Sequence, residues 1–323
     1  MRRDGVLLLL DKNQVELLLD RDEVLAAVHE AFVLHSQGEG RLFPVIREKL
    51  APGNVFGIKS GEVPSRDLLG FKAAGFWPAN RRAGGEPHQA TILLFDPKSG
   101  RPLCVIDGNA ITALRTGAAG GLGLLTLARS NCVRACVFGT GVQARIQVAF
   151  ALQLMPSLRQ VCYLTASGAS DPGFEHQWAG QCEISHALDA DAVVAASDVI
   201  ITATPSTTPL FNLHAVQPGT HLNCVGADTQ GKRELPPGLL ERARLFVDDR
   251  VQARQIGECQ WMPERPCVEF GDLLSSKVQF QRDSADVTIF DMTGLALQDL
   301  MVARGLHERA VARGVGSRID WLW

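Results

Sequence analysis

The sequence predicts an α/β protein that combines a doubly wound parallel sheet with a second, mixed α+β domain. Its 323 residues, of which 46% are hydrophobic, exceed the usual size of a single core. Residues 41–107 consist of short segments separated by Gly, Pro and Asn, which is typical of an antiparallel sheet with frequent turns. From about residue 130 to 292, buried strand-like runs alternate with helical patterns, which is typical of a parallel sheet.

The first domain opens with a strand and two helical segments. "GVLLLLD" is an apolar, strand-like run, and residues 11–40 then place Val24, Val28, Ala31 and Phe32 at helical spacing before a glycine-rich stop. The antiparallel strands are expected in "LFPVIREKL", "NVFGIKSG", "LLGFKAAGFW", "HQATILLFD" and "PLCVIDG".

A long helix then connects the two domains. "GNAITALRTGAAGGLGLLTLAR" has the length and small-residue content of a buried helix. Strands of the second sheet are expected in "CVRACVFG", "QVCYLTA", "CEISHAL", "DVIITAT", "THLNCVGAD", "RLFVDD" and "VTIFDMTG". The final amphipathic segment, "LALQDLMVARGLHERAVARG", is expected to return to the first domain. The predicted domains are therefore residues 1–118 with 302–323, and residues 119–301.

The amino-acid composition limits the kinds of molecule that this protein is expected to bind. Lys+Arg total 32 against Asp+Glu 35, for a net charge of −3, so no basic surface for nucleic acid or an anionic membrane is indicated. The N-terminal apolar run is too short for a signal peptide or a membrane span. The eight cysteines are scattered without a CxxC pair, which favours reduced core residues, a cytoplasmic location and no metal site. A small-molecule substrate is the expected partner.

The strongest local motif is a glycine turn. "VFGTGVQA" places Gly139, Gly141 and Ala144 as GxGxxA between an apolar strand and a helix. Gly139 permits a tight turn, Gly141 lets a pyrophosphate approach the backbone, and Ala144 lets the helix pack closely on the strand. The motif predicts a Rossmann-type nucleotide site, with an ordinary tight strand-to-helix turn as the alternative.

The choice between NAD and NADP stays open. An acidic residue that binds the adenosine ribose is expected about 20 residues after the motif. Thr165, Ala166 and Ser167 stand there instead, and the first acid is Asp171 in the following loop. No arginine accompanies them, so the pattern leans only slightly toward NADPH or dual use.

Four charged residues interrupt or end apolar runs: Arg47, Lys72, Arg115 and Asp228. Two guanidinium groups and one ammonium suit an α-carboxylate, and Asp228 would act as acid or base near a substrate nitrogen. Each has a simpler alternative. Arg47 could be an exposed edge-strand charge, Lys72 could extend to solvent, Arg115 could pair with an acid, and Asp228 could be a turn residue.

Together with the glycine turn, these residues resemble one family. The resemblance covers about residues 20–305 and rests on five segments in order: "GFKAAGFWPAN", "HQATILLFD", "DGNAITALRTGAA", "VFGTGVQA" and "VGADTQGKREL". They are similar to the ornithine cyclodeaminase/μ-crystallin family. The resemblance implies a Rossmann-type NAD(P)-binding domain and a substrate domain whose sheet forms a homodimer.

The resemblance also implies roles for particular residues. Arg47, Lys72 and Arg115 would hold the substrate carboxylate, while Lys72 and Asp228 would serve catalysis and proton transfer. The alignment around Arg47 is the loosest. The residues expected at the NAD(P)H cofactor are Thr116, Gly139, Gly141, Val142, Gln143, Thr165, Thr204 and Gly226.

The resemblance covers several chemistries that share hydride transfer at a carbon–nitrogen bond. Cyclodeaminases of the family resemble one another in a glutamate about 13 residues before the lysine, where this sequence has Lys59. A diamino substrate would therefore meet a cation. The favoured prediction is an NAD(P)H-dependent reductase of a 2-imino acid, either a cyclic ketimine such as Δ1-pyrroline-2-carboxylate or iminosuccinate.

Two neighbouring residues keep alternatives open. Lys59 would bind the second carboxylate of iminosuccinate or be a solvated strand lysine, and His88 would orient the substrate or be a core histidine. The alternative functions are an ornithine cyclodeaminase or alanine dehydrogenase, and a non-catalytic, crystallin-like protein that binds the nucleotide.

Overall fold

The computed structural model describes residues 5–51 and 53–321, and these form two compact units. The first contains the residues up to Arg115 and those from Leu295 on, and the second is Thr116–Gly294. One boundary falls inside helix α3 (Asn109–Leu127), and the other directly precedes helix α10 (Ala296–Arg313). The first boundary, 115/116, lies close to the predicted 118/119. The second, 294/295, differs from the predicted 301/302 because all of α10 belongs to the first unit.

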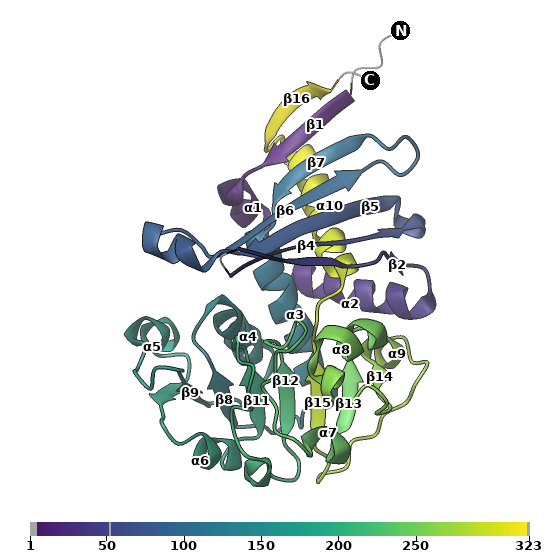
Figure 1. Cartoon of the computed structure of the whole chain (residues 1–323). Coiled ribbons are helices and arrows are strands. Elements are labelled where there is room, and N and C mark those ends of the chain that lie inside the picture. The colour runs from purple at the N-terminus through teal and green to yellow at the C-terminus, as the bar shows by residue number, and fades with distance from the viewer. Residues whose placement is uncertain (1–4, 52, 322–323) are drawn as a thin grey trace. The chain divides into compact units, whose positions relative to one another are not determined.

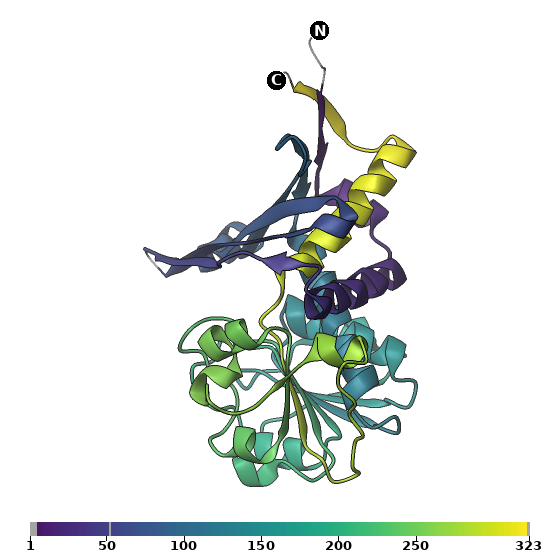
Figure 2. The same ribbon diagram turned by 90° about the vertical axis from the view of Figure 1, so that its right-hand side faces the viewer.

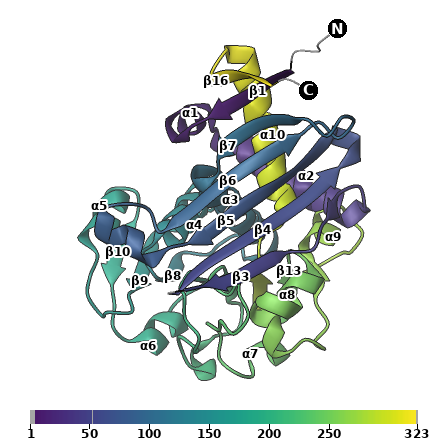
Figure 3. The same ribbon diagram turned by 45° about the horizontal axis from the view of Figure 1, so that its top comes forward.

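The first unit is built on a mixed sheet whose strand order is β16-β1-β7-β6-β5-β4-β2, with β3 also paired to β4 (Figure 3). All neighbours are antiparallel except β1 and β7, which are parallel. The antiparallel sheet predicted for residues 41–107 is thus confirmed. The strands are β1 (Gly5–Leu10), β2 (Arg41–Leu42), β3 (Ile46–Leu50), β4 (Asn54–Val63), β5 (Leu68–Phe76), β6 (His88–Phe95), β7 (Pro102–Asp107) and β16 (Ser317–Trp321).

Helices cover one face of this sheet. Leu68, Gly70 and Lys72 alternate as buried positions along β5, as expected for a strand with one covered face. Helix α10 packs on β4, β5 and α2, and Figure 2 shows it along one side of the sheet. The remaining elements are α1 (Lys12–Leu18), α2 (Arg21–Gln37) and the short 3₁₀ turns η1 (Pro64–Arg66) and η2 (Pro78–Ala83).

The second unit is a parallel sheet with helices on both faces (Figure 1). Its strand order is β10-β9-β8-β11-β12-β15-β13-β14, and every neighbouring pair is parallel. The strands are β8 (Arg134–Phe138), β9 (Gln160–Leu164), β10 (Glu183–His186), β11 (Val199–Thr202), β12 (His221–Cys224), β13 (Arg244–Val247), β14 (Val268–Glu269) and β15 (Thr288–Asp291). The helices are α4 (Val142–Leu154), α5 (Pro172–Trp178), α6 (Ala190–Ala195), α7 (Leu239–Arg242), α8 (Arg250–Ile256) and α9 (Phe270–Leu274), with 3₁₀ turns η3 (Leu213–Ala215) and η4 (Glu258–Trp261).

Alternate residues of β8 point to opposite faces of the sheet and belong to separate hydrophobic cores. Ala135 and Val137 join one apolar cluster, and Cys136 and Phe138 join the other. Strand β8 also pairs with β9 on one side and β11 on the other, so the strand order reverses beside it. Ligands of doubly wound sheets bind at the carboxyl ends of the strands at such a reversal. The predicted fold class is confirmed.

Helix α3 is mostly apolar, although it carries Arg115. Its length and composition alone would also suit a membrane span, but 72% of its most apolar window is buried inside the protein. A helix buried to this extent is a core helix, as the small-residue content of α3 predicts.

Candidate active site

In the first unit, Lys72 and Arg115 meet at one buried carboxylate. Lys72 comes from β5, Arg115 from α3, and Asp299 from α10; their exposed fractions are 4%, 7% and 0%. Lys72 Nζ lies 2.7 Å from Asp299 Oδ2, and Arg115 Nε lies 3.2 Å from Oδ1 of the same carboxylate. Two cations therefore share one buried anion.

Two uncharged side chains complete this cluster. Lys72 Nζ also donates to Thr112 Oγ1 at 3.3 Å, and Arg115 Nη1 donates to Gln298 Oε1 at 3.1 Å. Gln298 and Asp299 are adjacent on α10, so this helix orients both cations. Two cations facing one carboxylate leave a net positive charge, which favours an additional anion such as a substrate carboxylate.

The surroundings shift the pKa values of both Lys72 and Asp299. Burial lowers the pKa of Lys72 to about 7; the charge of Asp299 opposes that shift, and the charges of Arg115 and Lys59 reinforce it. Burial pushes the pKa of Asp299 upward, but Arg115 and Lys72 together hold it below its ordinary value. The carboxylate is thus ionised, and Lys72 exchanges its proton near neutral pH.

Asp299 and Gln298 were not predicted from the sequence. Arg115 was expected either at the substrate or paired with an acid, and it is paired with Asp299. The available signal was a single acid inside the apolar run "LALQDLMVA". Its partner in β5 is 227 positions away, so local patterns could not connect the two.

Arg47 lies on the exposed strand β3, opposite Gly57 of β4. Gly57 in turn lies opposite Ala74 of β5, so the register puts Arg47 on the sheet face that carries Lys72, two strands away. A Cβ at Gly57 would meet Arg47 Cδ at 3.4 Å, which places the Arg47 side chain over this glycine. Its role in substrate binding stays a prediction, because it lies on an exposed edge strand.

His88 is on the same face, at the start of β6. Burial, and next the charge of Lys72, lower its pKa to about 4, so the imidazole is neutral at physiological pH. Both roles predicted for His88, substrate orientation and core packing, are compatible with a neutral ring.

In the second unit, the glycine turn follows β8 as predicted. Gly139 has φ +98°, and a Cβ there would lie 2.9 Å from the Ala203 carbonyl oxygen, so this position favours glycine. Gly141 caps α4, and a Cβ there would meet nothing within 4 Å. The protein itself would accept a side chain at Gly141, so the open space is a cradle for a ligand.

The start of α4 offers further groups to a dinucleotide. Val142 is 65% exposed, and Gln143 Oε1 is buried with no hydrogen-bond partner among the described residues. The free N–H groups at this helix end favour phosphate. An open glycine cradle beside an unpaired buried oxygen fits a bound dinucleotide, which would supply the hydride.

The end of β9 lacks an available acid. Thr165 Oγ1 donates to the Ala169 carbonyl at 2.7 Å, and Asp171 is engaged elsewhere. The Asp171 carboxylate accepts from the Phe174 N–H as the cap of α5 and pairs with Arg145 at 3.1 Å. The structure thus explains why Asp171 is not poised for a ribose hydroxyl, and the choice of NAD or NADP stays open.

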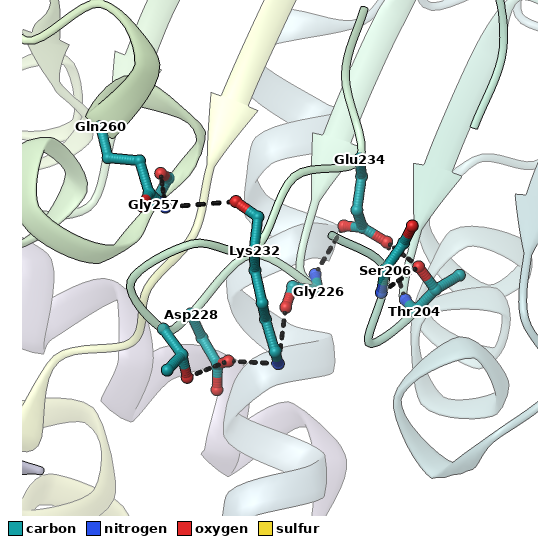
Figure 4. A network of polar contacts seen from close by, with 9 residues as sticks. Thr204, Ser206, Gly226, Asp228, Lys232, Glu234, Gly257 and Gln260 are labelled. Atoms are coloured by element: carbon teal, nitrogen blue, oxygen red, sulfur yellow. Dashed lines mark hydrogen bonds and ion pairs between the residues drawn. The ribbon is translucent and has the colours of Figure 1, made fainter. Parts of the chain in front are cut away.

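Thr204 and Gly226, both predicted at the cofactor, are held by the buried Glu234 (Figure 4). The Thr204 N–H and hydroxyl donate to Glu234 Oε1 at 2.8 and 2.7 Å, and the Gly226 N–H donates to Oε2 at 3.0 Å. A Cβ at Gly226 would lie 2.2 Å from the Thr204 carbonyl oxygen, so only glycine fits. Thr116, on α3, is buried and accepts from Gln147 Nε2 through its carbonyl at 2.8 Å.

Asp228 lies in the loop after β12, as Figure 4 shows, with Lys232 as its partner. Lys232 Nζ donates to Asp228 Oδ1 at 2.6 Å and to the Gly226 carbonyl at 3.0 Å, and Thr229 also donates to Oδ1. The Lys232 carbonyl accepts from Gln260 and Trp261 of η4. Asp228 therefore sits in a braced loop; Lys232 and Glu234 were not predicted.

A Rossmann-type unit with an open glycine cradle, and a unit that orients a lysine and an arginine around one carboxylate, define a dinucleotide-dependent oxidoreductase for an anionic substrate. The family comparison agrees: residues 6–314 match the ornithine cyclodeaminase/mu-crystallin family. The chain belongs to this family, and the predicted NAD(P)-dependent oxidoreductase class is confirmed.

Relatives with different substrates match along nearly the whole chain. An iminosuccinate reductase of Paracoccus denitrificans is 32% identical and covers 97% of this chain and 100% of its own. An archaeal alanine dehydrogenase dimer with bound NAD has a TM-score of 0.91 at 30% identity, covering 98% and 99% of the two chains. The Thermococcus litoralis Δ1-pyrroline-2-carboxylate reductase in complex with NADH and L-proline has a TM-score of 0.90 at 26% identity, covering 97% and 100%.

Proposed function

We propose that this protein is an NAD(P)H-dependent imino-acid reductase that delivers hydride to the C=N carbon of a 2-imino acid and releases an L-amino acid. The observation that carries the proposal is the Lys72–Asp299–Arg115 cluster. It buries two cations around one carboxylate and leaves them oriented for a substrate anion. The iminosuccinate and pyrroline-2-carboxylate reductases among the relatives support the same chemistry.

The residues divide the work as follows. Arg115 and the ammonium form of Lys72 bind the α-carboxylate and fix the imine, with Arg47 as a further contact. Gly139, Gly141, Val142 and Gln143 hold the dinucleotide. Lys72 or Asp228 supplies the proton at the substrate nitrogen, and the pKa of about 7 at Lys72 suits such an exchange. Orientation and charge, rather than a covalent step, are the protein's contribution.

Asp299 keeps Lys72 in place without taking part in hydride transfer. Its carboxylate is fully buried and binds both cations, so it fixes their positions whether or not substrate is present. A preorganised site of this kind avoids reorganisation when the imine binds.

The test is a substrate panel with the purified full chain. NADH and NADPH are each mixed with pyruvate plus ammonium, oxaloacetate plus ammonium, and Δ1-pyrroline-2-carboxylate, and loss of the reduced nicotinamide absorbance is followed. The proposal expects turnover with at least one imine and a clearly lower rate with ornithine or alanine plus NAD. Faster reaction with ornithine or alanine would support the cyclodeaminase or alanine dehydrogenase alternative. Nucleotide binding without any turnover would support the crystallin-like alternative.

The assembly and location belong to the same proposal. The archaeal relative is a dimer, which supports a homodimer here. All eight cysteines are free thiols, which supports a reducing, cytoplasmic location. Light scattering of the purified protein checks the oligomeric state.

A further inference from the structure

Two cysteines of the second unit lie side by side. Cys259 is in η4, and Cys267 directly precedes β14. Cys259 is 2% exposed and belongs to a hydrophobic core, and the half-buried Cys267 packs against that same core. Both are free thiols, and their side chains are hydrogen-bonding partners. The two sulfur atoms are therefore close enough to react with each other after a small movement.

Two arginines act on the more exposed of these thiols. Arg250 and Arg254 are four residues apart on α8, so they lie on one side of that helix. The hydrogen bond from Cys259 lowers the pKa of Cys267; burial opposes this shift, and the charges of Arg250 and Arg254 with a hydrogen bond from Arg250 reinforce it. The hydrogen bond to Cys267 and burial raise the pKa of Cys259, so Cys259 keeps its proton.

Other thiols of the chain have no such surroundings. Cys182 is half-buried like Cys267, but burial alone raises the pKa of its thiol. Burial likewise raises the pKa of Cys104 to about 12. Because the thiolate is the nucleophile, Cys267 is better suited to react than either of these residues.

We propose that Cys267 and Cys259 form an oxidant-reactive site, at which a hydroperoxide converts the two thiols into a reversible disulfide. The Cys267 thiolate attacks the terminal oxygen of the hydroperoxide. An S–O bond forms, the O–O bond breaks, and the departing alkoxide or hydroxide takes up a proton, which leaves Cys267 as a sulfenic acid.

The second step uses the neighbouring thiol. The Cys259 sulfur attacks the Cys267 sulfur, the S–S bond forms and the S–O bond breaks, and the Cys259 proton leaves with hydroxide as water. The two cysteines lose two electrons in total, and the hydroperoxide gains them. Cys267 is thus the attacking thiol, and Cys259 is the resolving thiol.

The experiment follows the thiols of the purified full chain under native conditions. Trypsin does not cleave the Arg265–Pro266 bond, so both cysteines fall in one peptide, residues 255–277. We expect a small excess of hydrogen peroxide to make this peptide two hydrogen masses lighter, and dithiothreitol to restore its mass. Direct oxidation of Cys267 to a sulfinic acid, or a pair that oxidises only in urea, would overturn the proposal.

Three cysteine variants assign the two steps. In Cys259→Ser, the sulfenic acid at Cys267 has no resolving thiol and should be captured by dimedone. Cys267→Ser should form neither the disulfide nor a dimedone adduct, and the control Cys182→Ser should form the disulfide at the wild-type rate. Circular dichroism and thermal melting establish that each variant is folded. Dimedone capture at Cys259 in Cys267→Ser would contradict the assigned order.

Alkylation gives a second readout that needs no oxidant. At about pH 7, iodoacetamide should modify Cys267 at least about tenfold faster than Cys182, because more of Cys267 is thiolate. Arg250→Met should slow the alkylation of Cys267 about three- to tenfold, since one of the stabilising cations is removed. Equal alkylation rates at Cys267 and Cys182 in the folded wild type would refute the reactive site.

Discussion

Lys72 has surroundings that a lysine rarely tolerates. Its ammonium is almost fully buried, and one carboxylate serves both it and Arg115. Burying a charge costs several kcal/mol unless it is paired, so Asp299 is what makes the position possible. Because two cations share that anion, a carboxylate ligand is attracted to the site.

The pH dependence of catalysis follows from Lys72. Its pKa of about 7 means that the ammonium form is lost as pH rises through neutrality in the free enzyme. Since the ammonium form of Lys72, unlike its neutral amine, adds to the attraction of Arg115 for the substrate carboxylate, kcat/KM for the imine should fall above pH of about 7. A bound carboxylate favours the ammonium, so the fall in kcat should occur at higher pH.

Lys72→Arg provides the control for this profile. Arginine stays charged throughout the range, so the variant should lose the alkaline fall in kcat/KM even where its absolute rate is lower. Steady-state kinetics of both proteins between about pH 6 and 9 measure the difference. A fall that persists unchanged in Lys72→Arg would assign it to another group.

The sequence predicted the two cations, Lys72 and Arg115, but not the side chains that pair with them. Lys72 and Arg115 stand out because they interrupt apolar runs. Asp299 escaped prediction because α10 also has a polar side, and an acid there could equally have been solvated. Its pairing depends on the tertiary packing of α10 on β5, which no local pattern encodes.

The turn between β8 and α4 contains two glycines with different structural roles. Gly139 is required by the fold, since its φ is +98° and a Cβ would meet the Ala203 carbonyl. Gly141 has ordinary backbone angles and open space around it. Nothing among the described residues requires glycine at position 141, which supports the proposed approach of the dinucleotide there.

Substituting each glycine by alanine separates folding from binding. Gly141→Ala should leave the thermal midpoint within about 2 °C and weaken NADH or NADPH binding at least tenfold, because the methyl group enters the phosphate cradle. Gly139→Ala should lower the unfolding free energy by about 1–3 kcal/mol through backbone strain. Nucleotide titration and thermal melting measure both. Undiminished nucleotide affinity in Gly141→Ala would place the phosphates elsewhere.

Most strands were predictable from apolar runs. Strands β9, β11 and β15 fall within predicted runs because buried parallel strands are mostly apolar, and β12 does so although it carries buried His221 and Asn223. Strand β14 has only two residues and carries no such signal. Helix α10 was predicted, but its first six residues, Ala296–Met301, lie in the other unit from the one predicted, because a domain boundary depends on packing.

The two units of the molecule carry different functional groups. The first provides cations oriented by a buried acid, and the second provides the glycine turn after β8 together with loops that are held by buried acids. Glu234, Glu258 and Asp291 of the second unit are all nearly inaccessible to solvent. Burial raises the pKa of Glu258 to about 8 and that of Asp291 to about 7, and the charge of Asp291 adds to the shift at Glu258.

These acids give the stability of the protein a pH dependence. Between its ordinary value of 4.5 and about 8, Glu258 keeps a proton in the folded state that the unfolded chain has released. The unfolding free energy therefore falls as pH rises through this window, by up to about 1.4 kcal/mol per pH unit for one group. Glu258→Gln should make that fall shallower, while the exposed Glu241→Gln should not. Urea unfolding midpoints from about pH 5 to 8 check this, and identical slopes for both variants would contradict it.

The most direct test of the central claim is the rate of imine reduction by Lys72→Met, measured at saturating cofactor with the best imine of the substrate panel. We predict a loss of several orders of magnitude in kcat/KM, with the circular dichroism spectrum and nucleotide affinity preserved. In the proposed function Lys72 binds the substrate carboxylate and is one of two candidate proton donors, whereas the proposed nucleotide-binding residues belong to the second unit. A folded Lys72→Met protein that reduces the imine at nearly the wild-type rate would contradict the account.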